Sequence, residues 1–157
     1  DLNGDGRDDI LQTGREGTAA DGFVRIQLMN ETGTGVSTSG FLSNGGGVWV
    51  LESVEDMNAD DRDDLIWVGQ VGTVAENLMR IEIIGEDGIS VDATGYPWIG
   101  GYTFLDVSDT DGNGRADLVL YTDNDVEIRM TESDGVSWGD TDTVTRGAGG
   151  AWEPVSP

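Results

Sequence analysis

The chain has 157 residues, which is enough for one domain with a hydrophobic core. It has 31 acidic and 8 basic residues, a formal net charge of −23, and every basic residue is an arginine. Nucleic acids and anionic membrane surfaces select for basic patches, so neither is expected as a partner. No apolar stretch is long enough to span a membrane. Strong acidity without lysine also suggests a salty environment.

The composition lacks several of the residue types that most often act as nucleophiles and bases in enzymes. The sequence contains no histidine, cysteine or lysine, which excludes Ser-His and Cys-His nucleophile systems, Schiff bases and histidine-built zinc sites within the chain. A carboxylate pair for glycoside hydrolysis stays open as an alternative, but with 31 acids such pairs arise too easily to carry weight. We therefore predict that the chain is not an enzyme.

An acidic nine-residue segment occurs three times, beginning at Asp1, Asp56 and Asp109, at spacings of 55 and 53 residues. A fixed period of this size indicates a repeat architecture. Positions one, three, five and nine are Asp or Asn in every copy, and position seven is arginine. Hard cations such as calcium take oxygen ligands of this kind from glycine-bent loops, so we predict about three calcium ions. The predicted ligands, with a backbone carbonyl at each arginine, are Asp1, Asn3, Asp5, Arg7 and Asp9; Asp56, Asn58, Asp60, Arg62 and Asp64; and Asp109, Asp111, Asn113, Arg115 and Asp117.

The EF-hand is the main alternative for such a loop. It requires a bidentate Glu at position twelve and a helix on each side. Position twelve is Gln12, Trp67 or Leu120 in the three copies, and short apolar runs rich in β-branched and aromatic residues follow position nine. Those runs are typical of strands, so each loop is predicted to join two strands.

The second loop is the copy in which the motif is least complete. Ala59 and Asp61 stand where the other loops have glycine. We expect both residues to adopt the left-handed backbone conformation, with some strain, because Asp tolerates this conformation better than most residues. The recurring arginines Arg7, Arg62 and Arg115 are expected to form salt bridges with neighbouring acids in a structural role, and Asp8 and Asp63, at position eight, to be solvated.

The residue pattern between the loops predicts four antiparallel strands in each repeat. The first repeat has an apolar strand at 10–11, an alternating strand at 24–28, a Thr-Gly turn at 32–33 and a weaker strand at 34–38. The second has strands at 49–55, 65–68, 79–83 and 89–93, with an Asp-Gly turn at 87–88. The third has strands at 102–108, 118–121, 126–130 and 136–140, with an Asp-Gly turn at 134–135. Asp-Gly between alternating runs is a hairpin signal, and no stretch has convincing helical periodicity.

The alternating strands are expected to be half-buried, with one apolar face and one solvated face. The polar residues expected on the solvated face are Arg25, Gln27, Arg80, Glu82, Glu127 and Arg129. Aromatic residues recur at the start of the strand before each loop, where we expect them to pack between strands: Trp49, Tyr102 and Trp152. The remaining tryptophans do not recur, and core packing is also expected for them: Trp67, Trp98 and Trp138.

Four-stranded units of this length are typical of propeller blades. On its three acidic loops and its strand frame, the chain resembles the FG-GAP/VCBS calcium-binding repeats, which also build the propeller of integrin α chains. The resemblance covers nearly the whole chain and implies a single repeat domain over 1–157, with blades at about 1–47, 48–100 and 101–150 and the first strand of a further blade at 151–157. It also implies an extracellular or cell-surface binding, adhesion or assembly module whose calcium is structural. A lectin-like propeller, or the non-catalytic propeller of a polysaccharide-active enzyme, is the alternative.

The number of predicted blades bears on how the chain assembles. Three blades cannot close a ring, because closed propellers typically have four to eight. The sequence starts at a first ligand position without an initiator Met, which suggests a processed product or an excised fragment. We expect residues 151–157 to complete the blade that begins at Asp1, contributed by another copy or by a neighbouring segment of a longer parent chain. The protein or glycan ligand itself is not specified by the sequence.

Overall fold

The computed structural model describes residues 1–122 and 125–145. These residues form eleven strands in three antiparallel sheets, which confirms the all-β prediction. The first sheet contains β1 (Ile10–Thr13), β2 (Phe23–Met29) and β3 (Val36–Ser43), in that order. The middle sheet contains β4 (Trp49–Glu55), β5 (Asp64–Gly69), β6 (Met79–Ile84) and β7 (Val91–Gly95). The third sheet contains β8 (Thr103–Ser108), β9 (Asp117–Tyr121), β10 (Asp125–Thr131) and β11 (Trp138–Thr145).

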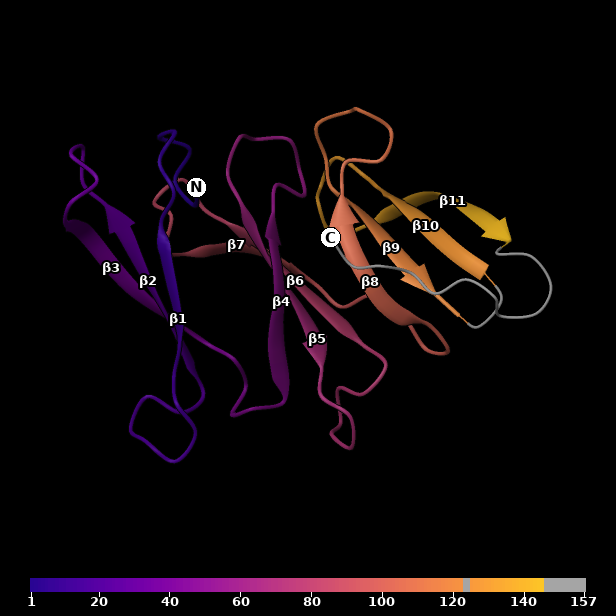
Figure 1. The fold of residues 1–157 in the computed structure, drawn as a ribbon, viewed down its shortest axis with the longest axis horizontal. Helices are drawn as coiled ribbons and strands as arrows, with labels where there is room; N and C mark the ends of the chain where they lie inside the picture. Colours follow the sequence, from indigo (N-terminus) through magenta and orange to yellow (C-terminus); the bar gives the residue numbers. More distant parts are fainter. Residues whose placement is uncertain (123–124, 146–157) are drawn as a thin grey trace.

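The three sheets follow one another along the long axis of the molecule, with the middle sheet between the other two (Figure 1). Each chain segment pairs with the next one by a hairpin, so sequence order and spatial order coincide within every sheet. No helix in the described part of the chain is long and apolar enough to cross a membrane. The expected strand at 151–157 lies outside the described residues.

The strand before the second loop has the predicted bounds, while the last strand of each sheet begins two residues later than predicted. The turn before it takes more residues than the sequence pattern indicated. Its closing hydrogen bonds run from Asn30 N to Gly35 O at 2.8 Å, from Gly85 N to Ser90 O at 3.0 Å and from Glu132 N to Ser137 O at 2.9 Å. The strand therefore starts only after this wider turn has closed.

Two hydrophobic cores hold the sheets together, one on each side of the middle sheet. Strand parity sends alternate residues of β5 to opposite faces. Leu65 and Trp67 join the core shared with the first sheet, while Ile66 joins the core shared with the third. All of these side chains are fully buried. The middle sheet is thus covered on both faces.

This double coverage corrects the prediction for the polar residues of β6. Arg80 and Glu82 were expected on a solvated face, yet they are only 6 % and 8 % exposed. They face the first sheet, which covers them. The same expectation is wrong for Glu127 of β10, which is 9 % exposed and lies on the face of the third sheet that packs against the middle sheet. Arg25, at the matching register position of β2, is exposed as expected. Alternation identifies the two faces of a strand, but it does not say whether another sheet lies over the polar one.

Arg80 and Glu82 belong to a buried polar cluster with two tryptophans. Glu82 Oε2 lies 3.5 Å from Arg80 Nη2 and accepts a hydrogen bond of 2.9 Å from the indole Nε1 of Trp67. The guanidinium carbon of Arg80 lies 4.4 Å from the centroid of the Trp67 ring and 5.4 Å from that of Trp49, within the range of cation–π attraction. Burial raises the pKa of Glu82, and Arg80 and Trp67 oppose this shift. The charges are therefore compensated inside the interface between two sheets.

The core prediction holds for Trp67, which is fully buried, and for Trp138, which is partly buried against the core between the middle and third sheets. It is wrong for Trp98, whose exposed fraction is 67 %. Trp98 lies just beyond β7, where Leu78 forms an isolated bridge to it. Trp152 lies outside the described residues.

Candidate metal centre

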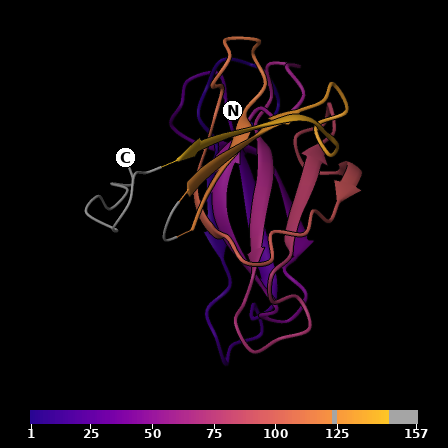
Figure 2. The same ribbon diagram turned by 90° about the vertical axis from the view of Figure 1, so that its right-hand side faces the viewer.

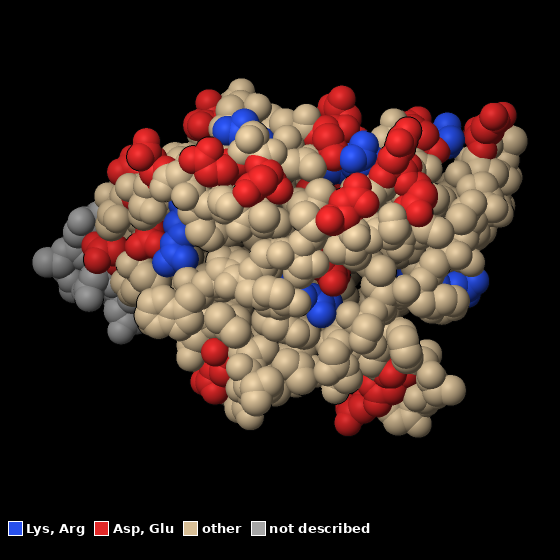
Figure 3. Space-filling view, turned by 180° about the vertical axis from the view of Figure 1, so that it is seen from behind, with Lys and Arg blue, Asp and Glu red and all other residues tan. Residues whose placement is uncertain are grey.

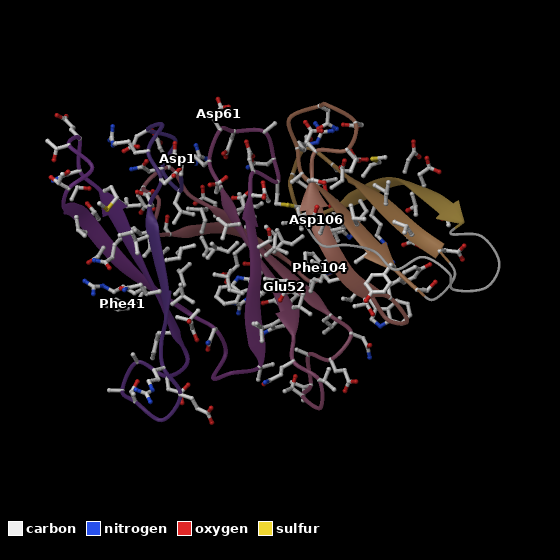
Figure 4. All side chains as sticks on the ribbon, viewed as in Figure 1. Asp1, Phe41, Glu52, Asp61, Phe104 and Asp106 are labelled. Atoms are coloured by element: carbon white, nitrogen blue, oxygen red, sulfur yellow. The ribbon has the colours of Figure 1, made fainter. Side chains whose placement is uncertain are left out.

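The three acidic loops lie along one edge of the molecule, at the top of Figures 1 and 2. Each loop is tied to the next by the same backbone hydrogen bond. The N–H at position eight donates to the carbonyl at position one of the preceding loop, from Asp63 to Asp1 at 2.9 Å and from Ala116 to Asp56 at 2.9 Å. Acidic side chains gather along this edge (Figure 3), and Figure 4 places Asp1 and Asp61 on it. The folding of the sheets therefore concentrates negative charge in one row.

The third loop brings its acids closest together. Carboxylate oxygens of Asp109, Asp111 and Asp117 all lie within 4.8 Å of one another, an arrangement that can hold a metal ion. Among residues 1–122 and 125–145, this is the one group of three carboxylates that meets this spacing. Asp109 Oδ1 accepts hydrogen bonds from Gly112 N and Asn113 N, and Oδ2 accepts one from Gly114 N. These bonds, that of Gly114 first, lower the pKa of Asp109 and keep it ionised.

The aspartate at position nine makes the same two backbone contacts in every repeat. One oxygen accepts from position two of its own loop, and the other accepts from the third strand of the repeat. In the middle sheet, Asp64 accepts from Met57 N at 3.0 Å and from Ile84 N at 2.8 Å. The corresponding donors are Leu2 and Met29 for Asp9, and Thr110 and Thr131 for Asp117. Position nine therefore anchors each loop to its sheet, a role that the loop sequence alone does not reveal.

Burial makes the charge of Asp64 costly. Its side chain has no exposed surface, and burial raises its pKa to about 7, although the hydrogen bonds from Ile84 and Met57 act in the opposite direction. The neighbouring carboxylates of Asp60 and Asp56 raise it further. A cation in this loop would stabilise the ionised form, because opposite charge favours ionisation.

The residue at position three accounts for the difference between the loops, because it is Asp111 in the third loop and an asparagine, Asn3 or Asn58, in the other two. Arg7 forms an ion pair with Asp5, and Arg62 forms one with Asp60, as expected for a structural arginine. In the third loop position five is Asn113, which has no charge to pair with. Arg115 donates from Nε to Thr131 O at 2.8 Å, and Arg62 makes the matching contact with Ile84 O at 3.5 Å. The position-five carboxylates of the first two loops are thus paired with arginine, whereas the third loop has a carboxylate at position three, which lies close to Asp109 and Asp117. The predicted ligand role of the position-seven carbonyls stays a prediction.

The second loop confirms the expected strain. Ala59 and Asp61 have φ angles of 62° and 64°, in the left-handed region. Glycines occupy the same positions in the other loops, with φ angles of 69° and 80° at Gly4 and Gly6. Glycine enters this region without a steric penalty, whereas other residues incur one of about 1–2 kcal/mol. The second loop thus keeps the backbone path of its neighbours at a cost in stability.

Relief of this strain should stabilise the protein. We expect Ala59→Gly to raise the free energy of unfolding by about 1 kcal/mol, and Asp61→Gly to act in the same direction. Urea denaturation at fixed calcium measures the effect. Ala19→Gly is the control, because Ala19 has no left-handed backbone and glycine there only adds freedom to the unfolded chain. A destabilised Ala59→Gly protein would contradict the strain argument.

A cleft of about 560 Å³ lies between the first and middle sheets, at the end of β5 opposite the acidic loops. Its lining combines one half-buried aromatic ring with carboxylates and amides: Trp49, Glu16, Asp21, Asn44 and Gln70. This combination suits a polar ligand that also presents an apolar ring face.

Comparisons with protein-family models, with curated proteins and with solved structures found no match. The FG-GAP/VCBS resemblance therefore stays a prediction from the loop motif.

Proposed function

We propose that the chain is a calcium-stabilised, non-enzymatic module of the propeller type, which serves in binding or assembly outside the cell. The observation that supports this most is the convergence of Asp109, Asp111 and Asp117 in a loop whose sequence pattern occurs three times. Three like charges within 4.8 Å repel one another strongly unless a cation lies between them. The donors are oxygen atoms alone, which favours a hard cation over a transition metal.

Calcium fits the loops better than magnesium does. The third loop is exposed and glycine-bent, and its donors come from alternate residues of a short segment. Calcium accepts six to eight oxygens in flexible geometry, whereas magnesium demands near-ideal octahedral geometry and retains several waters. When bound, the ion supplies positive charge that holds crowded carboxylates together. The remaining work is done by the chain, because Asp117 fixes the loop to β10 through Thr131 N.

Calorimetric titration with calcium tests this proposal. We expect about three ions per chain, and much weaker binding of magnesium. Asp109→Ala should remove one binding event, because it removes a carboxylate from the converged group. Asp8→Asn is the matched control, since Asp8 is an exposed loop acid outside the predicted ligand positions. An absence of calcium binding in the unmodified chain would refute the proposal.

A second function, carbohydrate binding, is favoured by the cleft between the first and middle sheets. Its aromatic, carboxylate and amide lining is the type that holds a sugar ring by stacking and hydrogen bonds. The face of Trp49 is shared with Arg80 and with Tyr96, whose ring centroid is 5.9 Å away, which leaves less of it for a ligand. We therefore place this function second. A glycan array on the calcium-loaded chain separates the two.

A further inference from the structure

The two internal contacts between sheets are built from the same links. Besides the loop-to-loop hydrogen bond, each contains an arginine of the third strand that donates to a carbonyl at the end of the preceding sheet. Arg80 Nη2 donates to Ser43 O at 3.1 Å, and Arg129 Nη1 donates to Trp98 O at 2.8 Å. The two arginines are at different register positions, because Glu127 and not Arg129 matches Arg80, but both interfaces combine the loop-to-loop bond with a bond from an arginine to a carbonyl.

A glycine contact also recurs at both interfaces. A glycine in the last strand of one sheet packs against the residue that follows the hairpin glycine of the next sheet. A Cβ added to Gly40 would lie 2.8 Å from Cβ of Ile89, and one added to Gly95 would lie 2.7 Å from Cβ of Val136. These pairs are thus in direct contact, and they mark matching points on the two interfaces.

The first sheet has an outward face of the type that the middle and third sheets use for packing. Its exposed side chains include Phe41, Phe23 and Ile10, with exposed fractions of 66 %, 45 % and 42 %. Arg25 lies on the same face, where it pairs in register with Phe41 and occupies the position of the buried Arg80. A cavity of about 410 Å³ over this face has two arginines and no acid in its lining, on a chain with a net charge of −23. Figure 4 shows Phe41 at this end of the molecule.

The third sheet supplies the complementary face. Val126 and Ile128 occupy the register positions that Met79 and Ile81 have in β6, on the side that turns towards the next sheet. Ile128 pairs with Asp142, just as Ile81 pairs with Gly95. This face is therefore apolar with an acidic residue on its last strand, whereas the first sheet offers aromatic rings and arginine.

We propose that the outward face of the first sheet binds the outward face of the third sheet of a second copy, head to tail. The interface continues the two internal ones. In the proposed interface, Thr34 of one copy occupies the position that Ile89 and Val136 have in the two internal interfaces. Asp142 of the other copy occupies the position of Gly40 and Gly95. The added side chain at Asp142 holds the sheets slightly farther apart, and the hydroxyl of Thr34 can donate a hydrogen bond to its carboxylate.

This association rests on the repetition of the sheets and does not depend on calcium binding. Two copies would provide six sheets, within the range of closed propellers, whereas failure to close would produce a chain of subunits. Each copy has a net charge of −23, so mutual repulsion opposes contact at low ionic strength. Association should therefore strengthen as sodium chloride concentration rises.

Cysteine cross-linking tests the orientation, because the sequence contains no cysteine. Thr34→Cys and Asp142→Cys are both at exposed positions, so folding should be preserved. Under mild oxidation at high salt, a mixture of the two variants is expected to give a disulfide-linked dimer, while neither variant alone should do so. Thr34→Cys mixed with Glu16→Cys, another exposed position, is the matched control and should stay uncross-linked.

Sedimentation equilibrium of the unmodified chain completes the test, in high salt with calcium and again with chelator. The expected result is a mass at least twice that of the monomer, reduced to the monomer by Phe41→Asp. A monomer at every salt concentration, or a dimer of Thr34→Cys with itself, overturns the proposal. Calcium binding without association would refute this interface but not the proposed function. Association of a chain that binds no calcium would refute the proposed function but not this interface.

Discussion

Saturating calcium should raise the thermal unfolding midpoint of this chain, and exhaustive chelation should lower it. A ligand that binds only the folded state stabilises it by about 2.7 kcal/mol at a concentration of one hundred times Kd. For a domain of this size each kcal/mol corresponds to about 2–4 °C, so each occupied loop should contribute roughly 5–10 °C. Scanning calorimetry or circular dichroism against free calcium concentration measures the shift.

Variants separate loop binding from general charge screening. Asp109→Asn removes a charge from the converged group of the third loop and should lose much of that loop's share of the calcium-dependent shift, while the other two loops keep theirs. Asp140→Asn removes an exposed charge from the same sheet and should retain the shift. The prediction is wrong if the unfolding midpoint is the same in calcium and after exhaustive chelation, or if both variants respond alike.

Replacement of Glu82 by alanine is expected to lower the free energy of unfolding by about 3–5 kcal/mol, the usual cost of breaking a buried ion pair. The change leaves Arg80 charged between two rings without its counter-ion, and it removes the acceptor of the Trp67 indole N–H. Both groups are almost fully buried, so water cannot replace the lost partner. Urea denaturation at constant pH and calcium concentration measures the loss.

Glu52→Ala is the control for this experiment, because Glu52 is an exposed acid on the neighbouring strand β4, and its loss should change stability by less than about 0.5 kcal/mol. The double variant Arg80→Met with Glu82→Leu removes both charges and should recover much of the loss. A Glu82→Ala protein as stable as the unmodified chain would show that the cluster contributes nothing to the contact between the first and middle sheets.

The positions of the strands and of the acidic loops could be predicted from the sequence. The oxygen spacing of the acidic motif marks the turns before β5 and β9, and period-two alternation identifies β2 and β6. These are local properties, since strand parity and turn chemistry act over a few residues. The same locality made the left-handed backbone of Ala59 and Asp61 predictable, because each loop had to follow the path of its glycine-containing neighbours.

Which faces of the sheets are buried could not be predicted from the sequence, because this depends on how the sheets pack against one another. The alternation of β2 and β6 is the same, yet Arg25 is exposed and Arg80 is enclosed, because a sheet lies over one strand and not over the other. Trp67 lies within β5 at the interface with the first sheet and is buried, whereas Trp98 lies beyond the end of β7 and is exposed. The anchoring of each loop by its position-nine aspartate likewise depends on a donor in the third strand of the repeat, such as Thr131 N for Asp117. Contacts between segments distant in sequence decide these outcomes, and a pattern within one strand or loop carries no information about them.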